Sequence, residues 1–309
     1  MPVVVVALDE WIKRVLDHTF LEVGISNMVQ SLLVADRDLL ARTHDSIHEF
    51  VLIAPLLLPP GHSWHEKSAF LAYHHVAFHQ AHRSFLEALA GYYNTAHVIL
   101  RSVLELVLRG ALWECLAHRE YREKAYVIER RARAKVYGKR RTILDWLQEI
   151  IQRAPQVEKD FERVSGAIFD KISPLFRDPE LRRLVPRPKV VVEQLAEWGI
   201  LTPYSADEVY AVYSELSEEV HVAPDRTDLG RRLLRERDLF KVEVIPEEIN
   251  KYLRLLHRTM DVSIVVELNV LSDWVKQSRH KQELVEKLEV LSDLKLQRAY
   301  DRLSTLLEG

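Results

Sequence analysis

Apolar residues recur three or four positions apart along most of the chain, which is the spacing of one buried face of an α-helix. The pattern is clearest between Glu66 and Arg119, where it predicts two helices joined at residues 91–94. Alternating strand patterns with hairpin turns are almost absent and glycine is scarce, so the sequence predicts an all-α fold. The first apolar stripe consists of Leu71, His75, Phe78, His82, Phe85 and Leu89, and the second of Ala96, Leu100, Val103, Val107 and Leu112.

Start and stop signals predict further helices on both sides of this pair. Ser205 followed by Glu208 is typical of a capping box, so a helix is expected from about Ala206 to Val222. Pro246 is placed to open a long helix, and the four residues before it form a short strand or an extended connector. Other helices are expected within residues 3–40 and at residues 36–50, 121–137, 142–153, 158–176 and 190–198.

These elements divide the chain into three parts. Residues 1–60 form N-terminal helices, residues 61–225 a helical core, and residues 226–309 C-terminal helices that pack on the core or mediate self-association. The tail from residue 273 to residue 307 keeps leucines at helical spacing with charged residues between them, which favours a packing helix or a pairing surface. A homo-oligomer is therefore expected.

Composition narrows the class of protein. Of the 309 residues, 48% are hydrophobic and 29% are charged, which is typical of a soluble globular chain. The net charge of −3 argues against a uniformly basic coat, so a nucleic acid has to bind a local patch. The single cysteine, Cys115, cannot form an internal disulfide, and no apolar run is long enough to span a bilayer. We therefore expect a cytoplasmic protein without membrane contact, and the scarcity of asparagine favours a thermophilic source.

Two charged residues lie inside the second apolar stripe. Arg101 and Glu105 are one helical turn apart and close enough to pair. A charge on a buried face is costly unless it is paired, so a neighbouring helix has to offer polar partners. The helix near residue 213 carries Tyr213, Ser217 and His221 on one face at intervals of four. These side chains form either a reactive site or a structural network that fixes the register of the two helices.

The residues around these positions carry a resemblance to a known superfamily. The pattern A-x-x-x-L-R-S-x-L-E on one helix, followed by Y-x-x-L-S-x-x-x-H on another, resembles the HEPN-like superfamily of helical bundles. The resemblance covers about residues 68–222 and implies a HEPN-like bundle with additional N- and C-terminal helices. The matching positions are Ala96, Leu100, Arg101, Ser102, Leu104 and Glu105, then Tyr213, Leu216, Ser217 and His221.

Many HEPN proteins are metal-independent ribonucleases or nucleic-acid-associated toxins and defence proteins, so the resemblance implies a function of this kind. Their usual active motif places His four to six residues after Arg on one helix, whereas here the nearest arginine, Arg226, follows His221. Arg101 on the other helix takes its place. In this hypothesis His221 is the general acid or base, Arg101 stabilises the anionic phosphate transition state, and Glu105 orients one of them.

A second candidate site is rich in histidine. Eight of the 14 histidines fall between His44 and His82, and the trio His75, His79 and His82 has ligand-compatible helical spacing for zinc or iron. The alternative is that these are ordinary packed or surface side chains, which is the interpretation we favour, so no metal and no cofactor is expected. The full set is His44, His48, His62, His65, His74, His75, His79 and His82.

A basic run between Glu129 and Arg141 is the third candidate. Against a slightly acidic chain it is the strongest electrostatic footprint for the phosphates of RNA or another nucleic acid, and the alternative is a solvated charged helix and turn. No glycine-rich phosphate loop, nucleophile elbow or zinc-finger spacing occurs. The predicted nucleic-acid contacts are Arg130, Arg131, Arg133, Lys135, Lys139, Arg140 and Arg141.

The sequence thus favours a HEPN-like nucleic-acid-associated protein, either a metal-independent ribonuclease or a defence or toxin component. The first alternative is a non-catalytic helical module for structure or interaction, in which Arg101, Glu105 and His221 only lock the core. The second is a histidine-rich metal-binding bundle.

Overall fold

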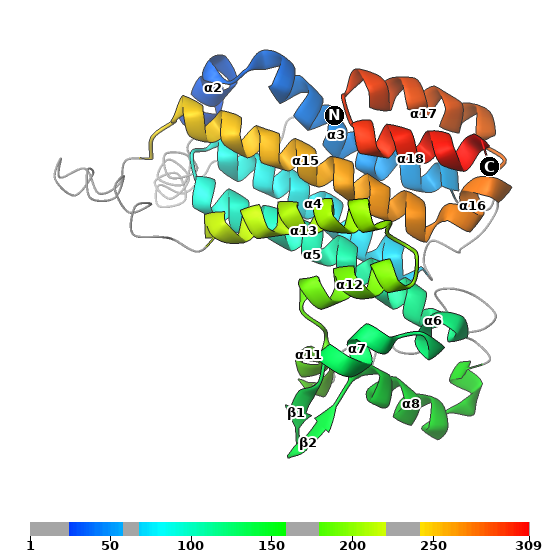
Figure 1. The fold of residues 1–309 in the computed structure, drawn as a ribbon. Helices are drawn as coiled ribbons and strands as arrows, with labels where there is room; N and C mark the ends of the chain where they lie inside the picture. Colours follow the sequence, from blue (N-terminus) through cyan, green and yellow to red (C-terminus); the bar gives the residue numbers. More distant parts are fainter. Residues whose placement is uncertain (1–24, 58–67, 159–178, 221–241, 309) are drawn as a thin grey trace, which may run out of the picture.

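The computed structural model describes residues 25–57, 68–158, 179–220 and 242–308, and it is predominantly helical (Figure 1). The all-α class is confirmed, with one two-stranded hairpin as the exception in the described ranges. The first elements are α2 (Ile25–Val34), α3 (Arg37–Ile53), η1 (Ala54–Leu57), α4 (Ala69–Leu89), α5 (Tyr93–Ala117), α6 (Arg119–Glu123), α7 (Tyr126–Arg131), β1 (Ala134–Val136), β2 (Lys139–Arg141) and α8 (Ile143–Arg153). The later ones are α11 (Pro179–Leu184), α12 (Pro188–Glu197), α13 (Pro203–Val220), α15 (Pro246–Val270), α16 (Ser272–Gln277), α17 (Lys281–Asp293) and α18 (Gln297–Glu308).

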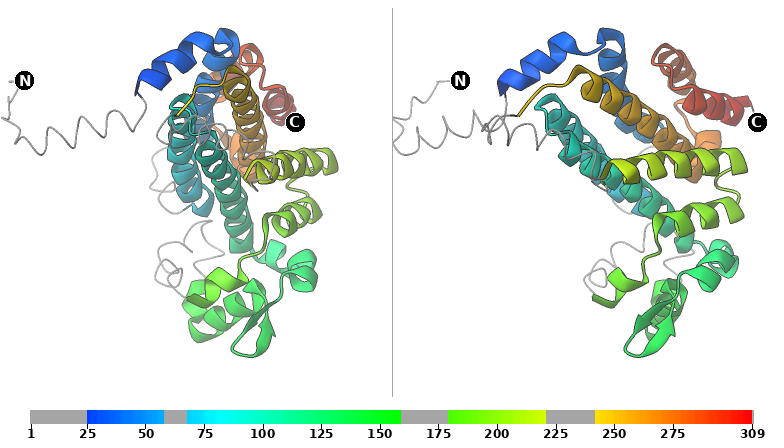
Figure 2. Two further views of the ribbon diagram at one scale, coloured as in Figure 1. Left: turned by 90° about the vertical axis from the view of Figure 1, so that its left-hand side faces the viewer. Right: turned by 60° about the vertical axis from the view of Figure 1, so that its left-hand side comes forward.

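The helical pair α4 and α5 forms the centre of the bundle, as the apolar spacing predicts. A turn at Gly91, with φ +92°, reverses the chain between them, and Leu100 and Val103 are fully buried on α5. The two helices approach closely at Gly110, because a Cβ there would lie 2.9 Å from the Cβ of Tyr73. Helices α3, α13 and α15 pack against this pair, and both views in Figure 2 show α15 running alongside it.

The chain between α5 and α8 departs from the prediction. Residues 121–137 were expected to form one charged helix, but the structure has α6, α7 and the hairpin β1–β2 there. Tyr137 and Gly138 have φ values of +48° and +80°, the conformation of a two-residue hairpin turn. The side chain of Val136, on β1, is buried and anchors the inner face of the hairpin. The single-helix prediction was wrong because a run of good helix formers hid this short turn.

The C-terminal helices pack on the bundle. Helix α18 lies against α15 and α17, and Leu291, Leu296 and Leu303 are fully buried. In the structure the leucines of the tail that suggested a pairing surface face the core of their own chain. No described helix combines the length and apolar character that crossing a membrane requires.

Several helix boundaries follow the predicted signals. Pro246 opens α15, residues 242–245 are an extended connector, and Gly199 ends α12 with φ +74°. Helix α13 begins at Pro203 rather than near Ala206, because the hydroxyl of Thr202 accepts the backbone N–H of Ser205 at 3.1 Å. The helix expected at residues 158–176 and those expected before residue 25 lie almost wholly outside the described residues.

Candidate functional site

Arg101 on α5 and Tyr213 on α13 meet between the two helices, as the sequence predicts for partners of a charge on an apolar face. Nη2 of Arg101 donates a hydrogen bond of 2.7 Å to the hydroxyl of Tyr213. The guanidinium carbon lies 5.1 Å from the centroid of the Tyr213 ring. Nε of Arg101 lies 3.2 Å from Oε1 of Glu105, one turn further along α5. The arginine is therefore held at three points.

Glu105 joins this contact to a second arginine. Its other oxygen, Oε2, lies 3.2 Å from Nη2 of Arg109. The side chains of Arg101 and Glu105 are 25% and 20% exposed, so the cluster is neither sealed in the core nor fully open. Two arginines against one carboxylate leave a local excess of positive charge. Such a site can attract an anion, and half-exposed ion pairs of this kind contribute about 0.2–1 kcal/mol of stability each.

The other two residues predicted on this face of α13, Ser217 and His221, make no contact with Arg101 that the structure describes. The hydroxyl of Ser217 donates to the carbonyl of Tyr213 at 2.8 Å, so it serves its own helix instead of Arg101. Val220 is the last described residue of α13, and His221, the proposed acid or base, lies outside the described residues. The structure therefore brings together Arg101, Glu105 and Tyr213.

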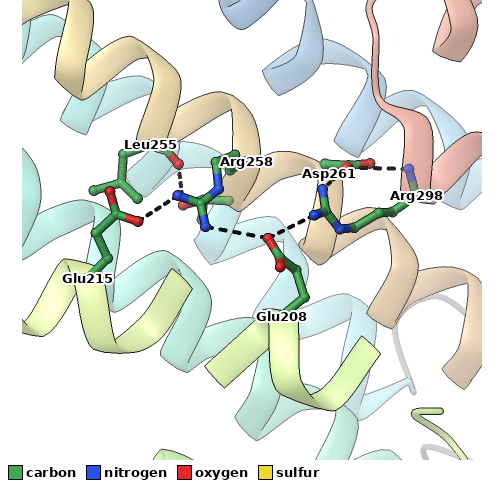
Figure 3. A network of polar contacts seen from close by, with 7 residues as sticks. Glu208, Glu215, Leu255, Arg258, Asp261 and Arg298 are labelled. Atoms are coloured by element: carbon green, nitrogen blue, oxygen red, sulfur yellow. Dashed lines mark hydrogen bonds and ion pairs between the residues drawn. The ribbon is translucent and has the colours of Figure 1, made fainter. Parts of the chain in front are cut away.

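Ion pairs that the sequence did not reveal fix the position of α13. Arg258 on α15 lies between Glu215 and Glu208 of α13 (Figure 3), and its guanidinium nitrogens are 2.5 Å from a Glu215 oxygen and 3.4 Å from a Glu208 oxygen. Arg298, just inside α18, lies 3.0 Å from Glu208 and 3.2 Å from Asp261 of α15. Glu208 is therefore an interhelical partner and not the capping-box residue that the sequence suggested. The only sequence signal was the seven-residue spacing of Glu208 and Glu215, which places both on one face.

Asp261 ends this network in a buried position. It accepts the backbone N–H of Ala299 at 3.0 Å and so caps the first turn of α18. Burial raises the pKa of the Asp261 carboxyl, while the hydrogen bonds from Ala299 and Arg298 work against that rise. The network ties α13, α15 and α18 together, and thereby holds Tyr213 against Arg101.

The histidines of α3 and α4 form two separate groups. His44 and His48 of α3 have ring centroids 4.7 Å apart, and His82 of α4 lies 5.0 Å from His48. His75 and His79 pair on an exposed part of α4, with Nε2 atoms 3.2 Å apart. The trio His75, His79 and His82 thus does not converge on one point. Within the described ranges, no group of three or more His, Cys, Asp or Glu side chains is arranged to hold a metal ion.

Burial of His82 affects its titration. The pKa of His82 is lowered, first by burial and then by the nearby imidazoles of His48, His44 and His79. The neutral form is therefore favoured in the fold. His74, by contrast, is buried in the core, where its Nε2 donates to the carbonyl of Phe50 at 2.7 Å. His62 and His65 lie outside the described residues.

The predicted nucleic-acid contacts divide into two kinds. Arg131 pairs with Glu193 of α12, while Arg141 pairs with Glu149 of α8 and, at 2.7 Å, with Glu180 of α11. The other five are exposed, and in the described part of the chain none of them forms an ion pair. We call these five the basic surface: Arg130, Arg133, Lys135, Lys139 and Arg140.

Gln194 of α12 positions the helix that precedes the hairpin. Its buried side-chain oxygen accepts the backbone N–H groups of Val127 and Ile128, at 3.0 Å and 3.1 Å. These are donors at the start of α7 that have no partner within the helix. Sequence reasoning missed this residue, because a glutamine 66 positions away in the chain carries no local signal.

No protein-family model, no curated protein and no solved structure matches this chain. The molecule therefore offers two clusters from which its function can be inferred. One is the arginine pair around Glu105 between α5 and α13. The other is the basic surface on α7 and the hairpin. The two clusters lie at different places, because Arg101 is about 24 Å along α5 from Ala117, the end of α5 from which the chain continues into α6, α7 and the hairpin.

Proposed function

We propose that this chain is an RNA-associated protein that binds phosphates through the basic surface. The observation that carries the proposal is the exposure of five cations within residues 130–140 of a chain whose net charge is −3. Exposed cations that form no ion pair can neutralise phosphates and release their counterions, which is the main source of affinity for nucleic acids. The hairpin projects at the end of the molecule opposite α2, so a long ligand can reach it (Figures 1 and 2).

The pairing of the hairpin strands supports this role. Lys135 lies directly across from Arg140, so the two cations share one face of the ladder. Like charges in this arrangement destabilise a two-stranded sheet. A bound polyanion relieves the repulsion, which gives the pair a reason to be on the same face. The opposite face holds Val136, which is buried, Arg141, which is paired with carboxylates, and the exposed Lys139.

A matched pair of triple variants tests the binding. Lys135, Lys139 and Arg140 are changed to Ala in one protein, and the exposed Lys276, Arg279 and Lys281 in the other. Both variants lose two lysines and one arginine, so their net charges are equal. We expect the hairpin variant to bind a labelled single-stranded RNA at least tenfold more weakly in fluorescence anisotropy, with the control variant close to wild type. Equal weakening in both would show that only net charge matters.

The resemblance supports RNA cleavage as the activity that accompanies binding. In this proposal His221 takes the proton of a ribose 2′-hydroxyl, the 2′-oxygen attacks the adjacent phosphorus, and the 5′-oxygen leaves with a proton from solvent. Arg101 balances the negative charge that gathers on the phosphate oxygens in the transition state. Glu105 and Tyr213 position Arg101. The support from geometry is that the guanidinium is fixed, partly exposed, and held by α13, whose last described residue, Val220, directly precedes His221 in the sequence.

Arg109 offers a matched control for the cleavage test. It shares Glu105 with Arg101 but has no role in the proposed chemistry. We expect Arg101→Ala and His221→Ala to lower the cleavage rate by about 10²- to 10³-fold, with Arg109→Ala near wild type, when all rates are compared at a temperature at which every variant is folded. If wild type cuts no RNA and both arginine variants only lower the melting temperature, the cluster is the structural lock of the non-catalytic alternative. Growth arrest on expression, relieved by His221→Ala, would support a toxin or defence role.

We also propose that the chain forms a homo-oligomer, as the sequence suggests. The tail leucines are buried within the chain, so they no longer support the proposal. Helix α2 supports it instead, because Val29, Leu32, Leu33 and Val34 are all exposed. Light scattering of wild type and of Leu33→Glu, the most exposed of the four, tests it. A monomeric wild type would contradict the proposal.

A further inference from the structure

The tip of the hairpin carries an aromatic side chain in an unusual position. Tyr137 is 84% exposed, more than any other large hydrophobic residue in the described ranges. Its φ is +48°, in the left-handed region that side chains other than those of Gly, Asn and Asp rarely adopt. A two-residue turn of this kind is most stable with Asn or Gly at that place. The tyrosine therefore costs stability at a position where smaller residues fit better.

No packing role offsets this cost. Among the described residues, the ring and hydroxyl of Tyr137 make no hydrogen bond, ring contact or cation contact. The next residue, Gly138, is equally open, since a Cβ built there would meet no atom within 4 Å. An exposed aromatic ring in a strained backbone position, with nothing of its own chain against it, points to a ligand.

The neighbours of Tyr137 define the chemistry of that ligand. Lys139 pairs across the ladder with Val136 next to the turn, and Lys135 pairs with Arg140 one step further away. Lys135 precedes Tyr137 by two residues on β1, and Lys139 follows it by two residues on β2, across the turn and on the opposite face of the ladder. The ring therefore projects from a hairpin tip that has exposed cations on both faces. Aromatic rings interleaved with cations bind single-stranded nucleic acids, in which each base exposes a flat face and each phosphate a charge.

We propose that Tyr137 stacks on an unpaired base of single-stranded RNA while Lys135, Lys139 and Arg140 contact the flanking phosphates. This inference rests on the proposed function and adds the form of the RNA that the surface selects. A duplex hides the faces of its bases within the stack, so it can meet the cations but not the ring. A hairpin tip only two residues wide can reach a base that is splayed out of a single strand.

The decisive variant is Tyr137→Asn. It removes the ring but places Asn before Gly138, the most favourable pair for this turn, so the hairpin is expected to hold its shape. Tyr137→Phe keeps the ring and removes the hydroxyl. Tyr204→Ala removes another tyrosine, 69% exposed, from the start of α13 and serves as the control. Binding of a 12-nucleotide single strand and of a 12-base-pair duplex RNA is measured by anisotropy, with RNA integrity checked on gels.

We expect Tyr137→Asn to weaken binding of the single strand by about 5- to 150-fold and to leave duplex binding unchanged. Tyr137→Phe and Tyr204→Ala should bind both like wild type. If Tyr137→Asn binds the single strand like wild type while the hairpin triple variant binds weakly, stacking is wrong and the basic surface stands. If Tyr137→Asn weakens duplex binding equally, stacking is also wrong. If wild type binds neither RNA, the proposed function itself fails.

Discussion

Arg101 and Tyr213 lie 112 residues apart in the chain and are joined by a hydrogen bond of 2.7 Å. This contact defines how α13 lies against α5. The arginine belongs to an otherwise apolar helix face, so without the tyrosine and Glu105 its charge would be only partly solvated. The pair is thus primarily a stabilising contact between α5 and α13. It is a candidate anion site only because its guanidinium is still partly exposed.

Removal of the Tyr213 hydroxyl measures how much this hydrogen bond contributes to the stability of the fold. Tyr213→Phe keeps the ring beside the guanidinium but takes away the hydrogen bond. We expect a loss of about 0.5–1.5 kcal/mol in the free energy of unfolding, measured with urea. Tyr210→Phe is the control, since that residue lies on the same helix with its ring 5.1 Å from Nζ of Lys189. A larger loss in the control would contradict the role given to Tyr213.

Gln194 is expected to hold α7, and with it the basic surface, in position. Gln194→Ala leaves the N–H groups of Val127 and Ile128 without their acceptor in a buried place. We predict a loss of about 1–3 kcal/mol in the free energy of unfolding and weaker RNA binding. Gln148→Ala on the exposed side of α8 should change neither quantity. Unchanged stability of the Gln194 variant would show that water replaces the amide.

The histidine group between α3 and α4 predicts an acid-sensitive fold. The pKa of His82 lies below the ordinary value of 6.5, chiefly because of burial. The unfolded chain therefore takes up its proton first as pH falls. Neutral His82 therefore favours the folded state. The stability that it contributes is fully present above about pH 6.5 and is lost as pH falls through the pKa of the folded protein.

His82→Gln removes that group, so the stability of this variant should fall less than that of wild type between pH 7.5 and 5.5. The free energy of unfolding at both pH values gives the comparison. His75→Gln, an exposed residue of the same helix, should follow wild type. A parallel decline in all three proteins would assign the acid sensitivity to other groups.

Glu267 predicts a change of the opposite sign. It is fully buried on α15, with His74 Nε2 at 3.4 Å from one carboxylate oxygen. Burial raises its pKa above 4.5, and His74 opposes the rise. The protonated form is thus favoured in the fold, so this stabilising contribution is present below about pH 4.5 and is lost as pH rises through the folded pKa.

Glu267→Gln carries a permanently neutral side chain. Its free energy of unfolding relative to wild type should therefore become more favourable between pH 4.5 and pH 7.5. The exposed Glu289→Gln on α17 should show no such trend. If the difference between the Glu267 variant and wild type is the same at both pH values, the carboxyl does not titrate in this range.

Much of the fold could be predicted from local sequence patterns. The apolar stripes predicted α4 and α5 with the turn at Gly91, because burial on one helix face repeats every three or four residues. In the first stripe, however, His75 is exposed, and the buried face of α4 includes Phe70, His74 and Ala77 instead. The charged run after Arg119 gave no such signal. There the turn at Tyr137 and Gly138 and the burial of Val136 decide the structure, and both depend on the surface against which the hairpin packs.

The candidate site could be predicted only in part. Arg101 was recognisable as a charge in need of a partner, and the spacing on α13 correctly brought Tyr213 to it. The ion pairs of Arg258 and Arg298 were not, because their carboxylates come from other helices some 40 to 90 residues away, and a charge in the sequence gives no sign of what it faces. For the same reason the sequence could not separate the paired Arg131 from the five cations of the basic surface.

The salt dependence of RNA binding tests the central claim most directly. Each phosphate contact with a single strand contributes about 0.7 to the slope of log K against log salt concentration. Change of Lys135, Lys139 and Arg140 to Ala should therefore flatten the slope by about 2, while the Lys276, Arg279 and Lys281 control keeps the wild-type slope. A slope that is the same in all three proteins, or affinity that does not depend on salt, would contradict binding through the basic surface.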